Sequence, residues 1–195
     1  MNESIIYRNI HWYRFLMNIL YLGFYKRRFN NITRLISRDS KSVVEFCFGD
    51  VFIAKYCRDN GIDWIGYDLN EEFVNYAVTH EFNAIIKDIL LLEDFPQCDT
   101  YIMIGSLYHF KEYSLEILTK MIKSSKQVII SEPIKNIATA KGLLGDIARK
   151  STNAGKGSEG FRYNLSSFTE LMSKLNVNYK IVSIDKDILI EIKND

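Results

Sequence analysis

Three acidic side chains stand at regular intervals in the first half of the chain, each at or near the end of a short apolar run. Glu45, Asp68 and Asp88 are separated by 23 and 20 residues. A single acid at the end of a strand most often caps the following helix. Three acids at matched spacing predict a shared site, because ligands bind beyond the carboxyl ends of neighbouring parallel strands.

The loop after the first of these acids is poor in glycine. It lies in VVEFCFGDVF (residues 43–52), where Gly49 is the only glycine. A loop that cradles a pyrophosphate carries several glycines, as in G-x-G-x-x-G, and the loop after Glu45 does not match that pattern. Asp50, beside the next helix start, would also repel a phosphate. The loop therefore argues against a dinucleotide site.

Four further polar residues are candidates for catalysis or for substrate binding. His109, in SLYHF, is either a general base or a packing histidine at a helix start. Glu132 either binds or deprotonates a substrate, or it holds the loop that follows it. Lys156 and Arg162, in TNAGKGSEGFRYN (152–164), belong either to a lid aimed at an anionic substrate or to a solvated loop. That stretch does not match the phosphate loop G-x-x-x-x-G-K-[ST], and we expect no metal site.

Alternating strand and helix patterns position these residues. Helical periodicity covers the first forty residues, with Gly23 as the expected break between two helices. Five buried strands are predicted next, and a hairpin closes the chain. The pattern predicts an α/β sandwich with a seven-stranded, mostly parallel sheet and an antiparallel C-terminal hairpin. The predicted strands are SVVEFC (42–47), DWIGYDL (63–69), NAIIKD (83–88), CDTYIMIGS (98–106), KQVIISEP (126–133) and the hairpin at 178–193.

Composition indicates a soluble globular chain with an uneven distribution of charge. The 195 residues suit one domain, and the net charge of +1 argues against a surface built for nucleic acid. Three cysteines without a C-x-x-C indicate free thiols, and together with the lack of a signal peptide or membrane span they predict a cytoplasmic protein. Residues 1–41 nevertheless carry +6, from eight basic residues against Glu3 and Asp39. The basic residues are Arg8, Arg14, Lys26, Arg27, Arg28, Arg34, Arg38 and Lys41.

The segment from Ser42 to Pro133 resembles the core of a class I S-adenosylmethionine (SAM)-dependent methyltransferase. The family's acid-x-Gly-x-Gly-x-Gly motif stands here as EFCFGDV (45–51), and its later acids match Asp68 in WIGYDLN and Asp88 in AIIKDIL. DTYIMIGSLYHF matches the strand-four motif, and residues 178–193 match the closing hairpin. The resemblance covers about half of the chain in its motifs and most of it in the order of elements. It implies a Rossmann-like methyltransferase sandwich with SAM as cofactor.

The resemblance also implies a role for each motif position. Asp68 would accept hydrogen bonds from both ribose hydroxyls, and Asp88 would bind the adenine edge between Ile89 and Leu69 as apolar walls. Gly49 would let the backbone approach the cofactor, and Glu45 would orient the loop or meet the cofactor's amino group through water. The expected cofactor residues are Glu45, Phe46, Cys47, Gly49, Asp68, Leu69, Asp88, Ile89, Ile104 and Gly105. His109 is the expected catalytic residue, and Tyr108, Glu132, Lys156 and Arg162 are the expected substrate-binding residues.

Two residues depart from the family's motif. Cys47 replaces the first glycine, which we expect to work only if its φ stays negative. Val51 replaces the third, where its β-branched side chain is expected to narrow the methionine pocket. The acidic loop with Asp50 suits SAM, since the cofactor carries a sulfonium cation and no phosphate.

The function expected is methyl transfer to an oxygen or nitrogen of a small molecule or glycan. One alternative is a non-catalytic binding or scaffold protein with a degenerate methyltransferase fold. Another is a nucleic-acid methyltransferase, against which the near-neutral charge and the lack of an N-P-P-[YF]-like motif after strand four both argue.

We expect a single domain over residues 1–195. Its parts are an N-terminal helical cover (1–41), a cofactor-binding core (42–133), an insertion or lid with the last helix (134–176) and a hairpin (177–195). The basic, aromatic N-terminal helices either close the cofactor pocket or touch an anionic membrane or acceptor, and both hold if KRR (26–28) faces solvent. A looser similarity to small bacterial methyltransferases of glycan or lipid-linked biosynthesis supports a biosynthetic role.

Overall fold

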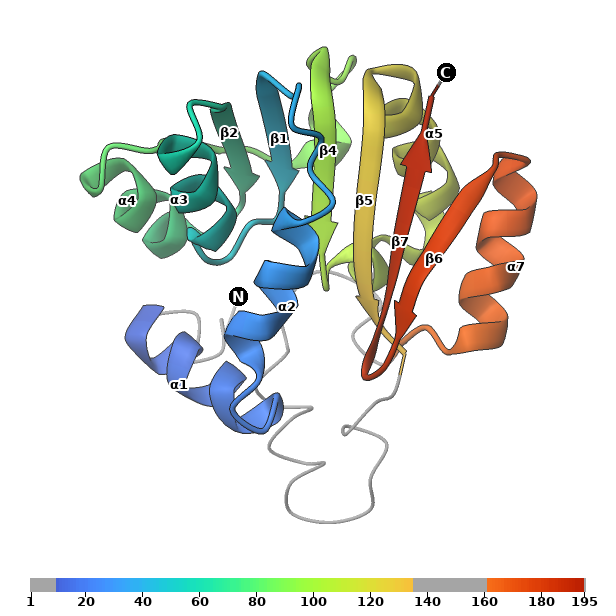
Figure 1. Ribbon diagram of the computed structural model, residues 1–195, viewed down its shortest axis with the longest axis horizontal. Coiled ribbons are helices and arrows are strands. Elements are labelled where there is room, and N and C mark those ends of the chain that lie inside the picture. The colour runs from blue at the N-terminus through green and yellow to red at the C-terminus, as the bar shows by residue number, and fades with distance from the viewer. Residues whose placement is uncertain (1–9, 135–160, 195) are drawn as a thin grey trace.

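The computed structural model describes residues 10–134 and 161–194. Its centre is a seven-stranded sheet in the order β3-β2-β1-β4-β5-β7-β6 (Figure 1). The strands are β1 (Ser42–Phe46), β2 (Asp63–Asp68), β3 (Asn83–Ile86), β4 (Cys98–Ile104), β5 (Ser125–Pro133), β6 (Tyr179–Ile184) and β7 (Asp187–Lys193). The first five strands pair in parallel, and β7 runs antiparallel to both β5 and β6. The predicted mostly parallel sheet with an antiparallel hairpin is confirmed.

Helices cover both faces of the sheet, since successive side chains of the central strands point to opposite faces. Val43 of β1 packs with α3 (Phe52–Asp59) and α4 (Glu71–Thr79) in one hydrophobic core. Val44 and Phe46 pack with α5 (Ser114–Lys123) and α7 (Leu165–Leu175) in the other. The sheet is therefore the middle layer of a three-layer sandwich.

The strand order reverses between β1 and β4, and the carboxyl ends of both strands meet at one edge of the sheet. Two N-terminal helices, α1 (Ile10–Leu20) and α2 (Tyr25–Thr33), lie beyond the arrowheads of β1 and β4 at this edge (Figure 1). The predicted break between them is found at Gly23, whose φ is +81°. The N-terminal helices thus lie where a ligand of such a sheet binds.

Some boundaries differ from the sequence prediction. β3 ends at Ile86, so Asp88 lies two residues past the strand. Helix α5 begins at Ser114, directly after a tighter 3-10 segment η3 (Leu107–Tyr113) that has a kink at Phe110. Most of the predicted insertion, residues 135–160, lies outside the described residues.

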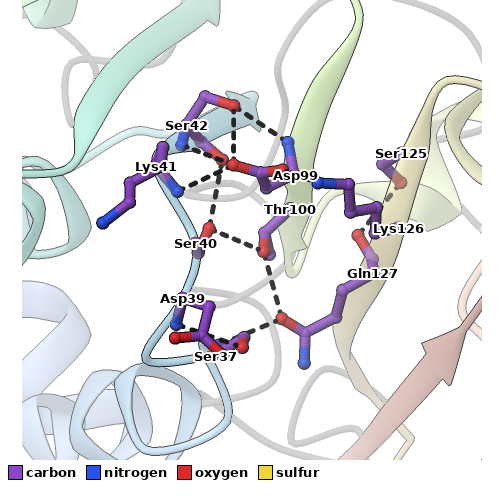
Figure 2. Close-up of polar contacts among 10 residues, drawn as sticks. All are labelled: Ser37, Asp39, Ser40, Lys41, Ser42, Asp99, Thr100, Ser125, Lys126 and Gln127. Carbon is purple, nitrogen blue, oxygen red and sulfur yellow. Dashed lines mark hydrogen bonds and ion pairs between the residues drawn. The ribbon is translucent and has the colours of Figure 1, made fainter.

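The segment after α2 runs back to the amino ends of the strands, where a polar network fixes it (Figure 2). Asp99 accepts hydrogen bonds from the backbone N–H of Lys41 (2.7 Å) and pairs with Lys126 (2.8 Å). The amide oxygen of Gln127 accepts from the backbone N–H of Ser37 (3.3 Å). These contacts anchor the N-terminal helices at the end of the sheet opposite to the one they cover.

Candidate functional site

The loop between β1 and α3 keeps glycine-like geometry at two positions. Gly49 has a φ of +57° and Cys47 a φ of +53°, with the Cys47 N–H donating to the carbonyl of Tyr67 (2.7 Å). The condition of a negative φ at Cys47 is not met, because this position adopts the left-handed region that favours glycine. The side chain of Val51 is fully buried in the core cluster that contains residues of α3, and the narrowing of a methionine pocket by Val51 stays a prediction.

Asp68 at the end of β2 holds this loop in place. One carboxylate oxygen accepts from the Gly49 N–H (3.0 Å), and the other accepts from the Asn70 N–H (2.9 Å). Burial raises the pKa of Asp68, although the three backbone N–H groups around it oppose the rise. A carboxylate has about four acceptor sites, so Asp68 retains acceptor capacity beyond these backbone N–H groups.

The two residues beyond β3 are placed differently from each other. Asp88 caps the short 3-10 segment η2 (Ile89–Leu91) by accepting from the Leu90 N–H (3.1 Å). Ile89 is buried in the core, whereas Leu69 is 40% exposed. Of the two expected apolar walls, only Leu69 therefore presents an open side chain.

Glu45 is a fully buried carboxylate on β1. One of its oxygens accepts from the indole N–H of Trp64 (2.9 Å), while the other, Oε1, has no partner among the described residues. Burial raises the pKa of Glu45 well above its usual value, with Asp50 and Asp68 adding to the effect. Gly66 makes room for the indole, because a Cβ there would lie 2.2 Å from the Trp64 ring.

The three strand-end acids converge on one residue, Cys47. Burial raises the pKa of its thiol well above the usual value, and the charges of Asp68, Asp88 and Glu45 raise it further. The expected cofactor residue Phe46 faces away from this cluster, into the core with Tyr101. The charges of Glu45, Asp68 and Asp88 thus all act on the loop at Cys47.

Helix α1 contributes two residues that the sequence did not single out. Arg14 forms a two-pronged ion pair with Asp50 of the loop, at 2.7 and 2.9 Å. The hydroxyl of Tyr13 lies 3.2 Å from where a Cβ on Gly49 would stand, so the helix closes directly over the glycine. Asp50 is therefore neutralised by Arg14, and the loop is less acidic than its sequence suggests.

The carboxyl end of β4 meets a buried arginine from α2. Gly105, with a φ of +64°, donates its N–H to the Ser131 carbonyl (2.7 Å), and Ile104 before it is buried. A Cβ on Gly105 would lie 2.8 Å from a terminal nitrogen of Arg28. Arg28 pairs with Asp187 of β7 (2.6 Å), and its side chain is only 8% exposed. The run KRR does not face solvent as a whole, because Arg28 turns inward.

Glu132 at the end of β5 holds the segment that follows β4. Its oxygens accept from the backbone N–H groups of Leu107 and Tyr108, both at 3.2 Å. Burial raises the pKa of Glu132 to about 8, against the opposing influence of Arg28 and these two N–H groups. Of the two roles expected for Glu132, its contacts match the holding of a loop. The loop that it holds follows β4, however, and not β5.

Tyr108, His109 and Arg162 form a stacked group beside Glu132. The rings of Tyr108 and His109 lie 3.9 Å apart between centroids, and the guanidinium of Arg162 lies 3.7 Å from the Tyr108 ring centre. Burial, helped by Arg162, lowers the pKa of His109 to about 4. The pKa of His109 therefore lies below the range near neutrality that suits a general base. Lys156 lies outside the described residues.

No protein-family model matches the chain, and no curated protein matches it in sequence. Solved methyltransferase structures share its fold. A SAM-dependent methyltransferase from Archaeoglobus fulgidus is 17% identical, with a TM-score of 0.66 over 93% of this chain and 100% of that one. Human N-acetylserotonin methyltransferase, solved with SAM, is 15% identical, with a TM-score of 0.63 over 96% of this chain and 57% of that one.

An O-methyltransferase family protein from Burkholderia thailandensis is 12% identical, with a TM-score of 0.69 over 96% of this chain and 61% of that one. The chain thus spans about three fifths of the length of the human and Burkholderia proteins. At these identities the similarity establishes the Rossmann-like methyltransferase fold.

Proposed function

We propose that this protein binds SAM at the carboxyl ends of β1, β2 and β3 and transfers its methyl group to an oxygen or nitrogen of a small molecule or glycan. The observation that carries the proposal is the convergence of Glu45, Asp68 and Asp88 around a loop in glycine-like geometry. The methyltransferase fold supports the same reading.

The residues present fit this cofactor. Asp68 keeps lone pairs for the two ribose hydroxyls while it fixes Gly49 for close approach. The buried Oε1 of Glu45, which no described residue satisfies, suits the cofactor's ammonium group directly or through a water. Tyr13 of α1 lies against Gly49 and covers the loop on the side of the N-terminal helices.

When bound, the cofactor supplies an electrophilic methyl group, whose bond to sulfur breaks as the bond to the acceptor forms, with the electron pair left on sulfur. The chain's own part is alignment and the exclusion of water. Glu132 fixes Tyr108 and the residue before it at the end of β4. His109, with a pKa of about 4, is neutral at neutral pH and suits orienting an acceptor hydroxyl more than removing its proton.

Calorimetry with SAM and S-adenosylhomocysteine tests the proposal before any acceptor is known. Both should bind the full chain, and Asp68→Ala should weaken S-adenosylhomocysteine by about 1.5–3 kcal/mol, the range for hydrogen bonds to a charged group. Asp63→Ala is the matched control, because Asp63 is an exposed acid at the other end of the same strand. Unchanged affinity in folded Asp68→Ala would remove Asp68 from the site, and no binding by the natural chain would favour the non-catalytic scaffold.

The basic N-terminal helices support a separate proposal of peripheral membrane contact. Trp12 (58% exposed) and Phe15 (54%) stand outward on α1, while Lys26 and Arg27 are exposed at the start of α2. Aromatic and basic side chains side by side suit the headgroup region of anionic bilayers. Among the described residues, no helix is long and apolar enough to cross a membrane.

Co-sedimentation with vesicles tests this contact. The chain should pellet with vesicles rich in phosphatidylserine and stay in solution with phosphatidylcholine alone. Trp12→Ser combined with Phe15→Ser should reduce the pelleted fraction, whereas Tyr113→Ser, at an exposed aromatic residue (51%) outside the N-terminal helices, should not. Equal pelleting with both lipids would remove the electrostatic part of the proposal.

A further inference from the structure

The edge of the sheet beneath the N-terminal helices is divided by charge. Beyond β1, β2 and β3, the acids Glu45, Asp50, Asp68 and Asp88 face one cation, Arg14. Beyond β4, β5 and β7, the cations Arg28, Lys186 and Arg162 accompany Asp187 and Glu132. Because the pKa of Glu132 is about 8, this second half is net positive at neutral pH.

Arg28 is the central cation of the positive half. Its Nε pairs with Asp187 (2.6 Å) and donates to the Ser131 hydroxyl (3.2 Å), and its Nη2 donates to the Ser131 carbonyl (3.2 Å). The guanidinium also lies 5.1 Å from the centre of the Tyr21 ring. Its side chain is more than nine-tenths buried, so its position is fixed by these contacts.

The remaining terminal nitrogen of Arg28 is not used by the fold. Nη1 donates to no residue within the described parts of the chain, although a guanidinium carries five N–H donors. Both terminal nitrogens lie against Gly105, since a Cβ there would be 2.8 Å from Nη2 and 3.1 Å from Nη1. Because Gly105 has no side chain, the guanidinium of Arg28 reaches the end of β4, where Nη1 is the terminal nitrogen that the described residues leave unused.

We infer that Arg28 is the receptor for a carboxylate carried by the methyl acceptor. The inference rests on the proposed function and names the acceptor's chemical class. Arg28 contacts β5 and β7, on the opposite side of β4 from Asp68, so it lies in the half of the edge left to the acceptor. A planar carboxylate matches the donor edge of a guanidinium.

A carboxylate suits this position better than a phosphate. Asp187 already offsets the charge of Arg28, and the surrounding half retains a small net positive charge. A monoanion balances that charge, whereas a phosphate dianion in a buried place would need more donors than Nη1 and the free edge of Nη2 supply. Tyr13 and Tyr21 both pack against Tyr25 at this end of α2, so the surroundings of Arg28 are largely aromatic.

The test compares pairs of acids and their neutral amides on the full chain saturated with S-adenosylhomocysteine. Suitable pairs are 4-hydroxybenzoate with 4-hydroxybenzamide and indole-3-acetate with indole-3-acetamide, followed by calorimetry or ligand-observed NMR. Each acid should bind at least about 10-fold more tightly than its amide, as expected for a charge-assisted hydrogen bond. Equal binding of acids and amides would overturn the inference.

Arg28→Lys identifies the residue, since lysine keeps the charge beside Asp187 and removes the open donor edge. Arg28→Lys should lower the affinity for the acids about 10-fold and leave the affinities for the amides and S-adenosylhomocysteine unchanged. The control Arg27→Lys, at an exposed neighbour, should change none of these affinities. If Arg28→Lys fails to fold, Arg28→Met with Asp187→Asn removes both charges together and should show the same selective loss. Unchanged binding of the acids in either folded variant would overturn the inference.

S-adenosylhomocysteine has a carboxylate of its own, to which Arg28 could bind in place of the acceptor's carboxylate. A further probe distinguishes these two roles. Methylthioadenosine lacks that carboxylate. If Arg28→Lys weakens S-adenosylhomocysteine but not methylthioadenosine, Arg28 holds the cofactor and the acceptor assignment is wrong. Failure of the natural chain to bind S-adenosylhomocysteine would instead sink the proposed function, and acid-over-amide preference would still be measurable without it.

Discussion

Cys47 shows that a glycine motif can lose its glycine and keep its backbone. A side chain in the left-handed region costs about 1–2 kcal/mol, yet Cys47 adopts a φ of +53° next to Gly49 at +57°. The loop is held there by the hydrogen bonds from Cys47 to Tyr67 and from Gly49 to Asp68. These contacts, and not the glycine count, define whether the loop can receive a ligand.

Cys47→Gly should therefore preserve or improve S-adenosylhomocysteine binding. The free energy of unfolding should change by less than about 1 kcal/mol, because relief of the left-handed strain is offset by the greater freedom of glycine in the unfolded chain. Denaturant unfolding and calorimetry measure the two quantities. Cys47→Ala is the control that keeps the Cβ, and loss of binding in both folded variants would assign a role to the thiol.

Glu45→Gln should stabilise the fold and weaken the binding of the cofactor. A raised pKa means that the folded state disfavours the charged form, so the natural chain loses stability as pH rises above the usual glutamate value. At pH 7.5 the variant should gain roughly 1–3 kcal/mol, while S-adenosylhomocysteine should bind about 10-fold more weakly. Below about pH 4.5 the difference in stability should vanish. A variant less stable at pH 7.5 would contradict the assigned burial cost.

At the scale of elements, α1 and α2 are fastened to the sheet by inward-turned arginines. The +6 charge of residues 1–41 suggests a basic surface. Arg14 instead forms an ion pair with Asp50 of the loop, and Arg28 forms one with Asp187 at the start of β7. The two helices are thus joined electrostatically to both halves of the edge that they cover.

Arg14→Ala should release α1 from the loop and destabilise the protein by about 2–3 kcal/mol. This is less than the value for a fully buried pair, because the Arg14 side chain is 23% exposed. Hydrogen exchange in α1 should rise more than in α5, which lies on the other face. Adding Asp50→Asn should recover part of the loss, since asparagine can still accept from the Val51 N–H and leaves no unpaired charge. Additive effects of the two substitutions would refute the coupling.

For the whole molecule, the sequence predicted the architecture and the convergence of the acids. Continuous apolar runs identify strands buried on both faces, and the short connections restrict how parallel strands are ordered. The contacts that α1 and α2 make with the sheet could not be predicted, because helical periodicity does not say which of the eight basic residues in 1–41 turn inward. Gly105 and Gly66 were the available signals, since each leaves space for one large side chain, Arg28 or Trp64.

Stability of the whole molecule should fall as pH rises from about 6.5 to 8. In this window the folded state binds more protons than the unfolded one, because the pKa of Glu132 is about 8 and burial also raises the pKa values of Glu45 and Asp68. His109 makes stability rise with pH instead, but this contribution fades between about pH 6.5 and 7.5 as the unfolded histidine loses its proton. Denaturant unfolding at several pH values measures the slope.

Glu132→Gln should flatten this slope, because its neutral amide does not titrate. The same variant should be less stable at pH 6.5, since the amide nitrogen cannot accept from the N–H of Leu107 or Tyr108. An unchanged slope in the variant would show that Glu132 is ionised in the folded protein at neutral pH.

The contacts between α1–α2 and the closing hairpin also bear on the order in which the chain folds. Tyr21 donates to Asp187, 166 residues further along, and Lys186 donates to the Leu20 carbonyl. Contacts at such separation carry a large loop-closure entropy and form after local ones. During synthesis α1 and α2 emerge long before the hairpin, so they lack their contacts with Lys186 and Asp187 until the end of the chain has been made. The edge that holds the proposed cofactor is therefore completed only when the last strands have left the ribosome.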